Sequence, residues 1–167
     1  KYIKKMISDN CHIIDIGAES SKPGFIEVPI DKQISRILPI ISEIKKISDD
    51  ITISIDTRSS KVAESALKEG ANIINDVSSG NNDKNMFDVV AKYNADIILT
   101  HMPDEHLTSD NIKCDDILEN VEDYFREQIN QAVKSGISQN NIIIDPGICF
   151  GKSGNDNIKL LSNMKYL

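Results

Sequence analysis

Short isoleucine-rich runs in this chain repeatedly end in a polar residue and a turn. The runs end in Asp15-Ile16-Gly17, Asp56-Thr57, Asn75-Asp76 and Asp145-Pro146-Gly147. An apolar run without period-2 alternation indicates a strand buried on both faces, as in a parallel sheet. A carboxylate or amide at the carboxyl end of such a strand lies where α/β proteins bind ligands. We therefore expect one ligand site that several strand ends build together.

Helical patterns separate these strands. Strands are expected up to Gly17, around Ile53–Ile55, up to Val77, over Ile97–Thr100 and over Ile142–Ile144. Helices are expected through Ser8 and over Ile34–Ile47, Ser60–Lys68, Met86–Tyr93, Ile117–Val133 and Ile158–Leu167, because apolar residues recur there at helical spacing. Pro39 marks a kink or a division into two shorter helices.

Five strands, each followed by a helix, place the chain in the α/β class. A complete (β/α)8 barrel needs roughly 250 residues, whereas this chain has 167 and both opens and closes inside a helical pattern. We expect residues 1–167 to form a single domain, a partial TIM barrel of about five βα units. A five-stranded doubly wound sheet is the structural competitor. As a nucleotide-binding domain it would need a Gly-rich loop after the first strand, and Gly17-Ala18-Glu19 is not one.

Composition narrows the partners and the compartment. The net charge of -7 argues against a general nucleic-acid surface. No apolar stretch is long enough to span a membrane. Cys11, Cys114 and Cys149 are widely spaced and form no Cys-x-x-Cys pair, so a structural zinc site is not expected. This cysteine pattern fits a reduced, cytoplasmic compartment. Lys22 and Lys152 each lie near a glycine in an expected loop, where a single cation can bind an anion.

The loop sequences resemble those of one family. Asp15-Ile16-Gly17-Ala18-Glu19-Ser20-Ser21-Lys22-Pro23-Gly24 resembles the Asp-Ile-Gly-Gly-Glu-Ser-Thr-Arg-Pro-Gly signature of dihydropteroate synthase. Ser54-Ile55-Asp56-Thr57, Asn75-Asp76-Val77-Ser78-Ser79-Gly80, His101-Met102 and Asp145-Pro146-Gly147-Ile148-Cys149-Phe150-Gly151-Lys152 resemble later strand ends of that family, in the same order. A single motif of this kind would be weak evidence, but the ordered set is specific.

The resemblance implies a TIM-barrel transferase of folate biosynthesis. Such an enzyme joins 4-aminobenzoate to 6-hydroxymethyl-7,8-dihydropterin diphosphate, releasing diphosphate and 7,8-dihydropteroate. It uses Mg2+, is inhibited by sulfonamides that mimic 4-aminobenzoate, and is usually a homodimer.

The resemblance also assigns roles to residues. Asp145 is the pterin anchor, because a carboxylate can accept two parallel hydrogen bonds from the pterin edge. Asp56 is a second carboxylate near the pterin that can stabilise positive charge as diphosphate leaves, so Asp56 and Asp145 are the expected catalytic residues. The other implied contacts are Asn75, Val77 and Phe150 for the pterin, and Ser21, Lys22 and Pro23 for 4-aminobenzoate and diphosphate.

Taken without the resemblance, several of these residues have plainer interpretations. An Asp before Pro-Gly, such as Asp145, is typical of a turn. Asp56 could cap the following helix, and Phe150 could be a core aromatic. Among the departures from the family pattern, Lys22 replaces an Arg, which removes a bidentate fork for phosphate, and Cys149 replaces a Gly.

Other family segments have no counterpart in this chain. They include a first strand whose Asn helps to hold Mg2+, and later strands that carry a Lys, a Ser and an Arg-x-His cluster. We therefore expect no metal ligand in this chain and no activity from it alone. Two other functions compete: a pterin-binding methyltransferase that uses methyltetrahydrofolate and a corrinoid partner, and a non-catalytic pterin-binding relative.

Overall fold

Helices and strands alternate along the chain. The computed structural model describes residues 2–20, 26–102 and 116–167. The strands are β1 (Ile13–Gly17), β2 (Thr52–Asp56), β3 (Ile73–Asp76), β4 (Asp96–Thr100) and β5 (Ile142–Asp145). The helices are α1 (Tyr2–Ser8), α2 (Ile30–Ile47), α3 (Ser60–Glu69), α4 (Met86–Tyr93), α5 (Ile117–Lys134) and α6 (Gly154–Asn163), and a 3-10 turn at Gln139–Asn141 precedes β5.

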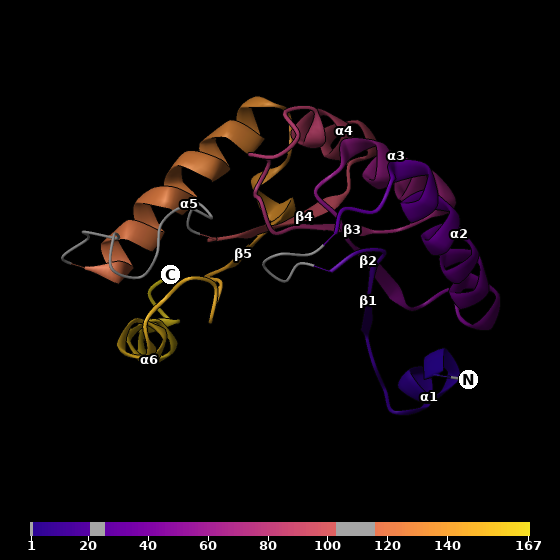
Figure 1. Cartoon of the computed structure of the whole chain (residues 1–167), viewed down its shortest axis with the longest axis horizontal. Helices are drawn as coiled ribbons and strands as arrows, with labels where there is room; N and C mark the ends of the chain where they lie inside the picture. The colour runs from indigo at the N-terminus through magenta and orange to yellow at the C-terminus, as the bar shows by residue number, and fades with distance from the viewer. Residues whose placement is uncertain (1, 21–25, 103–115) are drawn as a thin grey trace.

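The five strands form one parallel sheet in sequential order, β1-β2-β3-β4-β5. A doubly wound sheet reverses direction and places its first strand inside the sheet, so the competing fold is wrong. Sequential order is how a (β/α)8 barrel winds. Figure 1 shows the sheet as the inner layer of an arch, with α2 to α5 outside it and with α1 and α6 at the two feet.

One face of the sheet packs against the helices. Seven strand residues on this face are at most 6% exposed: Ile14, Ile16, Ile53, Ile55, Ile74, Ile97 and Leu99. The helices cover them with buried side chains such as Ile41 of α2, Ala66 of α3 and Val90 of α4. In β1 burial alternates residue by residue, and Ile13 is 50% exposed. Burial on both faces was therefore the wrong expectation for this strand.

Helix α2 differs from its prediction in two ways. It begins at Ile30 instead of Ile34, because its first turn is largely polar and carries no apolar stripe. It also runs through Pro39 as one helix, although a proline inside a helix costs roughly 3 kcal/mol. Ile37 before Pro39 and Ile41 and Ile44 after it are fully buried. Packing on both sides of the proline thus outweighs the lost backbone hydrogen bond.

Helix α6 begins four residues before the predicted start at Ile158. A capping box fixes its first turn: Ser153 Oγ accepts from the Asp156 N–H at 3.2 Å, and Asp156 Oδ2 accepts from the Ser153 N–H at 3.2 Å. Ser-x-x-Asp is a known helix-start pattern. It was the signal in the sequence that would have placed this boundary.

Cys149 has a left-handed backbone, with φ of 69°. A side chain other than glycine is disfavoured there, because its Cβ crowds the following carbonyl oxygen. This explains why the resembling family has glycine at this position. The Cys149 side chain is exposed, and its backbone N–H donates to Asn157 Oδ1 at 2.8 Å, a bond that any residue could make.

We therefore predict that Cys149→Gly stabilises the full-length protein. The gain should be about 1 kcal/mol, the left-handed penalty less the chain entropy that glycine adds. Gly136→Ala is the matched control: Gly136 has φ of 98°, and a Cβ there would only touch the Ala91 Cβ at 3.7 Å. Urea unfolding should show the control losing stability. A Cys149→Gly variant less stable than the wild type would contradict the strain argument.

Candidate functional site

The predicted pterin residues lie on one face of the sheet at its carboxyl edge. Asp56 pairs in register with Asn75 on the neighbouring strand. Asn75 pairs with Ile98 of β4, and Asp145 pairs with Thr100, two residues further along the same strand. Because side chains alternate between faces, Asp56, Asn75 and Asp145 all point away from the helices. The structure therefore brings these three residues to one surface on the concave side of the arch.

Asp15 is a further member of this surface that the sequence did not single out as a site residue. It lies on β1, two residues before Gly17, so it shares the face of Asp56. Asn75 Nδ2 donates to Asp15 Oδ2 at 3.3 Å. This contact leaves the Asn75 oxygen directed elsewhere, available to accept a hydrogen bond from a ligand. The sequence signals were its place in a polar strand ending, its period-2 spacing from Gly17 and its position as the first residue of the family signature.

Asp76 shows that adjacent residues of a strand direct their side chains to opposite faces of the sheet. It follows Asn75 directly, yet its side chain is fully buried and is used by its own loop. Its carboxylate accepts from the Ser78 N–H at 2.9 Å, from Ser78 Oγ at 2.6 Å and from the Gly80 N–H at 2.8 Å. Asp76 therefore shapes the turn after β3 and does not face the candidate site.

The surroundings of Asp56 disfavour the charged form of its carboxyl group. Its pKa is raised from 3.8 to about 6, first because burial removes water from the carboxylate and then because Asp15, Glu19 and Asp76 are negative neighbours. Arg58 acts in the opposite direction but is the smallest influence. At neutral pH the site therefore holds a carboxylate whose charge is only partly compensated. Such a group interacts strongly with positive charge that forms beside it.

Asp145 is held by the turn that follows it. Its Oδ1 accepts from the Gly147 N–H at 2.9 Å, and its backbone carbonyl accepts from the His101 N–H at 2.9 Å. The turn interpretation of this Asp is thus correct for one lone pair of Oδ1. Oδ2 and the second lone pair of Oδ1 remain for a ligand. Val77 is buried just after β3, and Phe150 is half-buried in the turn after β5.

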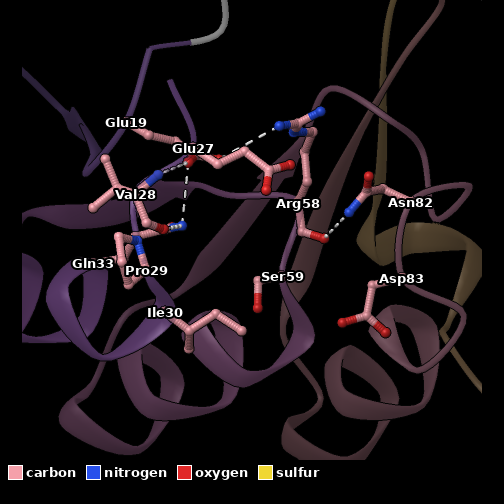
Figure 2. Close-up of a pocket in the computed structure, with 10 residues that line it drawn as sticks. All are labelled: Glu19, Glu27, Val28, Pro29, Ile30, Gln33, Arg58, Ser59, Asn82 and Asp83. Carbon is pink, nitrogen blue, oxygen red and sulfur yellow. Dashed lines mark hydrogen bonds and ion pairs between the residues drawn. The ribbon is translucent and has the colours of Figure 1, made fainter. Parts of the chain in front are cut away.

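Glu19 connects three described segments of the chain (Figure 2). Its Oε2 accepts from the Val28 N–H and from Gln33 Nε2, both at 3.2 Å, and its Oε1 lies 3.6 Å from Arg58 Nη2. One half-buried carboxylate therefore joins the loop, the first turn of α2 and the start of the α3 segment. In the sequence, Glu19 was notable only as a member of the motif that runs from Asp15 to Gly24.

A cavity of about 390 Å3 lies beside this junction. Its lining comprises Glu19, Glu27, Val28, Pro29, Ile30, Gln33, Arg58, Ser59, Asn82 and Asp83. Asp56, Asn75 and Asp145 are absent from that lining. The candidate site is therefore the surface at the strand ends, where the hydrogen-bond acceptors lie together. The cavity next to Glu19 is not part of this site.

His101 is structural. It is 4% exposed, its Nε2 lies 3.0 Å from Asn120 Oδ1, and its ring meets Tyr124 edge-on at 4.9 Å. Burial, assisted by the nearby Lys152 charge, lowers the pKa of His101 to about 4. The imidazole is therefore neutral at physiological pH and is committed to packing, so we assign it no role in catalysis.

Three predicted ligand contacts lie outside the described residues, namely Ser21, Lys22 and Pro23. Their roles stay predictions. Within residues 2–20, 26–102 and 116–167, no group of three or more His, Cys, Asp or Glu side chains is arranged to hold a metal ion. We therefore derive no step through Mg2+. In the same residues, every helix is too short or too polar to cross a lipid bilayer.

Comparison with known proteins identifies the family of this chain. The family model described as pterin binding enzyme matches residues 1–167. The curated dihydropteroate synthase of Clostridium beijerinckii is 41% identical over 167 residues, which are 100% of this chain and 60% of that protein. The Clostridium difficile dihydropteroate synthase, solved in the presence of pteroic acid, is 38% identical with a TM-score of 0.88, and the match covers 98% of this chain and 60% of that one.

A second solved structure is more distant in sequence and equally close in shape. It is the Xanthomonas albilineans dihydropteroate synthase with 4-aminobenzoic acid, 31% identical with a TM-score of 0.89, covering 98% of this chain and 57% of that one. The chain thus spans about 60% of the length of these relatives. Its fold is part of their TIM barrel. From the family match over residues 1–167, we conclude that the chain belongs to the pterin-binding enzyme family.

Proposed function

We propose that the protein containing this chain is a dihydropteroate synthase. It would condense 6-hydroxymethyl-7,8-dihydropterin diphosphate with 4-aminobenzoate and release diphosphate. The observation that carries the proposal is the alignment of Asp56, Asn75 and Asp145 on one face of successive strand ends. Relatives at 41% and 38% identity bear that enzyme's name.

The proposed recognition step uses hydrogen-bond complementarity. Asp145 accepts paired N–H groups from the amino group and ring nitrogen of the pterin, and the Asn75 amide accepts from another part of the ring. A ligand without those donors would leave buried acceptors unpaired and would be rejected. Val77 and Phe150 supply apolar surface for the ring.

The proposed chemical step requires positioning and charge stabilisation. The amine of 4-aminobenzoate is a neutral nucleophile, so no general base is needed. Its nitrogen forms a bond to the methylene carbon while the bond from that carbon to the diphosphate oxygen breaks, and the amine then loses its proton. Asp56, a poorly compensated carboxylate, would stabilise positive charge on the methylene carbon during this exchange.

Further properties belong to the same proposal. Sulfonamides would compete with 4-aminobenzoate, Mg2+ would assist the diphosphate through a ligand outside this chain, and the full-length enzyme would be a cytoplasmic homodimer. The methyltransferase alternative shares a pterin carboxylate. The Glu19-Ser20-Ser21-Lys22-Pro23-Gly24 loop favours the synthase, as do the names of the relatives.

Asp145→Asn should strongly weaken pterin recognition. An amide presents one acceptor where the ligand needs two, so affinity for 6-hydroxymethyl-7,8-dihydropterin diphosphate should fall by about 100-fold or more. Calorimetric titration of the full-length protein measures this directly. Asp88→Asn, an exposed carboxylate on α4, is the matched control and should bind as the wild type does.

If the wild type binds, turnover with 4-aminobenzoate should follow, inhibited by a sulfonamide. A folded wild type that binds no pterin would refute the proposal and favour the non-catalytic alternative. Pterin binding without turnover, together with methyl transfer from methyltetrahydrofolate, would favour the methyltransferase.

Asp56 should make stability depend on pH. Its pKa is about 6 in the folded state and 3.8 as the ordinary value, so the folded protein binds more protons between these values. Stability from this group is therefore complete below pH 4 and is lost as pH rises through 6. Asp56→Asn should match the wild type near pH 4 and exceed it at pH 8, by on the order of 1 kcal/mol after solvent screening.

Urea unfolding of both full-length proteins at pH 4 and at pH 8 checks this sign. Titrating groups that do not interact with Asp56 are common to the two proteins and cancel in the difference. A variant that is equally or less stable than the wild type at pH 8, relative to pH 4, would rule out a raised pKa at Asp56. The same substitution should lower turnover, because the stabilising carboxylate is gone.

A further inference from the structure

Lys152 does not serve as the free cation that its place beside a glycine indicated. Its Nζ donates to three backbone carbonyl oxygens: that of Gly147 at 2.8 Å, that of His101 at 2.9 Å and that of Phe150 at 3.3 Å. An ammonium group has three N–H donors, so all three are used. The side chain is half-buried and directed into the turn after β5. An anion would have to displace these bonds to reach the charge.

The three carbonyls belong to two strand ends. His101 follows β4, whereas Gly147 and Phe150 follow β5. The backbones meet so closely here that a Cβ added to Gly147 would clash with the His101 carbonyl oxygen. Gly147 also has a left-handed φ of 65°. The Lys152 ammonium lies at this junction and bonds to carbonyls on both of its sides. The Gly147 carbonyl also accepts from the Phe150 N–H at 3.1 Å.

A short chain of hydrogen bonds connects Lys152 to Asp145. Lys152 Nζ binds the Gly147 carbonyl, and the Gly147 N–H binds Asp145 Oδ1 at 2.9 Å. The His101 carbonyl that Lys152 also binds belongs to the residue whose N–H donates to the Asp145 carbonyl. Lys152 thus bonds to His101 after β4 and to Gly147 after β5, and both of these residues also hydrogen-bond to Asp145.

The pKa of Lys152 agrees with a structural role inside the turn after β5. Burial lowers the pKa of Lys152 to about 8, while Asp145, Asp156 and Cys149 act in the opposite direction. The lysine therefore gives up solvation for its three carbonyl contacts, with Asp145 as its largest compensating charge. A solvated loop lysine gathering anions would not be sequestered in this way.

We propose that Lys152 is a positioning residue for pterin recognition. By holding the turn after β5 against the end of β4, it orients the Asp145 carboxylate so that Oδ1 keeps its bond from the Gly147 N–H while Oδ2 and the second lone pair of Oδ1 face the ligand. This inference rests on the proposed function and adds a residue to it. Pre-orientation of a recognition group by a second set of hydrogen bonds is how affinity is retained at buried polar sites.

A double-mutant cycle on the full-length protein tests this role. The ligand is 6-hydroxymethyl-7,8-dihydropterin diphosphate, and affinity is measured by calorimetric titration for Lys152→Met, Asp145→Asn and the pair. Lys152→Met should bind about tenfold more weakly, because Asp145 loses its fixed orientation. In the Asp145→Asn background the same change should alter affinity by less than about twofold, because Lys152 acts through that carboxylate.

Lys159→Met is the matched control. Lys159 lies on α6 and pairs with Asp116 at the surface at 2.9 Å, so its loss should leave affinity unchanged. If Lys152→Met does not fold, Lys152→Gln replaces it in the same cycle, since an amide keeps two N–H donors without the charge. Circular dichroism confirms that each variant is folded before titration.

Two outcomes overturn the inference alone. The first is normal binding by the wild type with equal binding by the folded Lys152 variant. The second is a further tenfold loss in the Asp145→Asn background, which would show that Lys152 acts independently of Asp145, either on the ligand or on general stability. Absence of binding by the wild type would instead overturn the proposed function, and the positioning role with it.

Discussion

The site depends on the alternation of side chains along parallel strands held in one register. Isoleucines at every second position fill the space under the helices, and the residues between them are left for the open face. A slip of one residue would exchange the two sets and bury Asp56 or Asn75 against α3. Asn75 and Asp76 illustrate the constraint, because these adjacent residues end on opposite faces with different partners. The apolar core therefore sets the positions of the polar site.

Much of this arrangement could be predicted from sequence, because it is encoded locally. Ile-rich runs ending in Asp or Asn marked the strands, and the same endings marked the carboxyl edge. The order of the strands was not local information: a doubly wound sheet fitted the same elements, and the sequential order with β1 at the edge of the sheet excluded it. The contact from Asn75 to Asp15, 60 residues apart in the chain, was likewise invisible in the pattern.

Where prediction failed, tertiary packing or a missed local signal was responsible. Pro39 would end an isolated helix, but buried isoleucines on both sides keep α2 continuous. The capping box at Ser153 is present in the sequence, but the predicted start of α6 followed the apolar stripe instead. The residue type of Lys152 indicated a solvent-exposed cation in a loop. The folded structure instead surrounds its ammonium group with three backbone carbonyls. Charge alone does not reveal whether a lysine meets solvent, a ligand or its own backbone.

The sequential strand order has a consequence for how the chain is made. Each of the strands β2 to β5 pairs with the strand encoded just before it. Contacts of short sequence separation lower the entropy cost of closing loops and favour rapid assembly. During synthesis from the N-terminus, β1 and β2 can pair once the ribosome has released them, and each later βα unit adds to the existing edge. The site would then be completed one strand end at a time, with Asp15, Asp56 and Asn75 in place before Asp145 is translated.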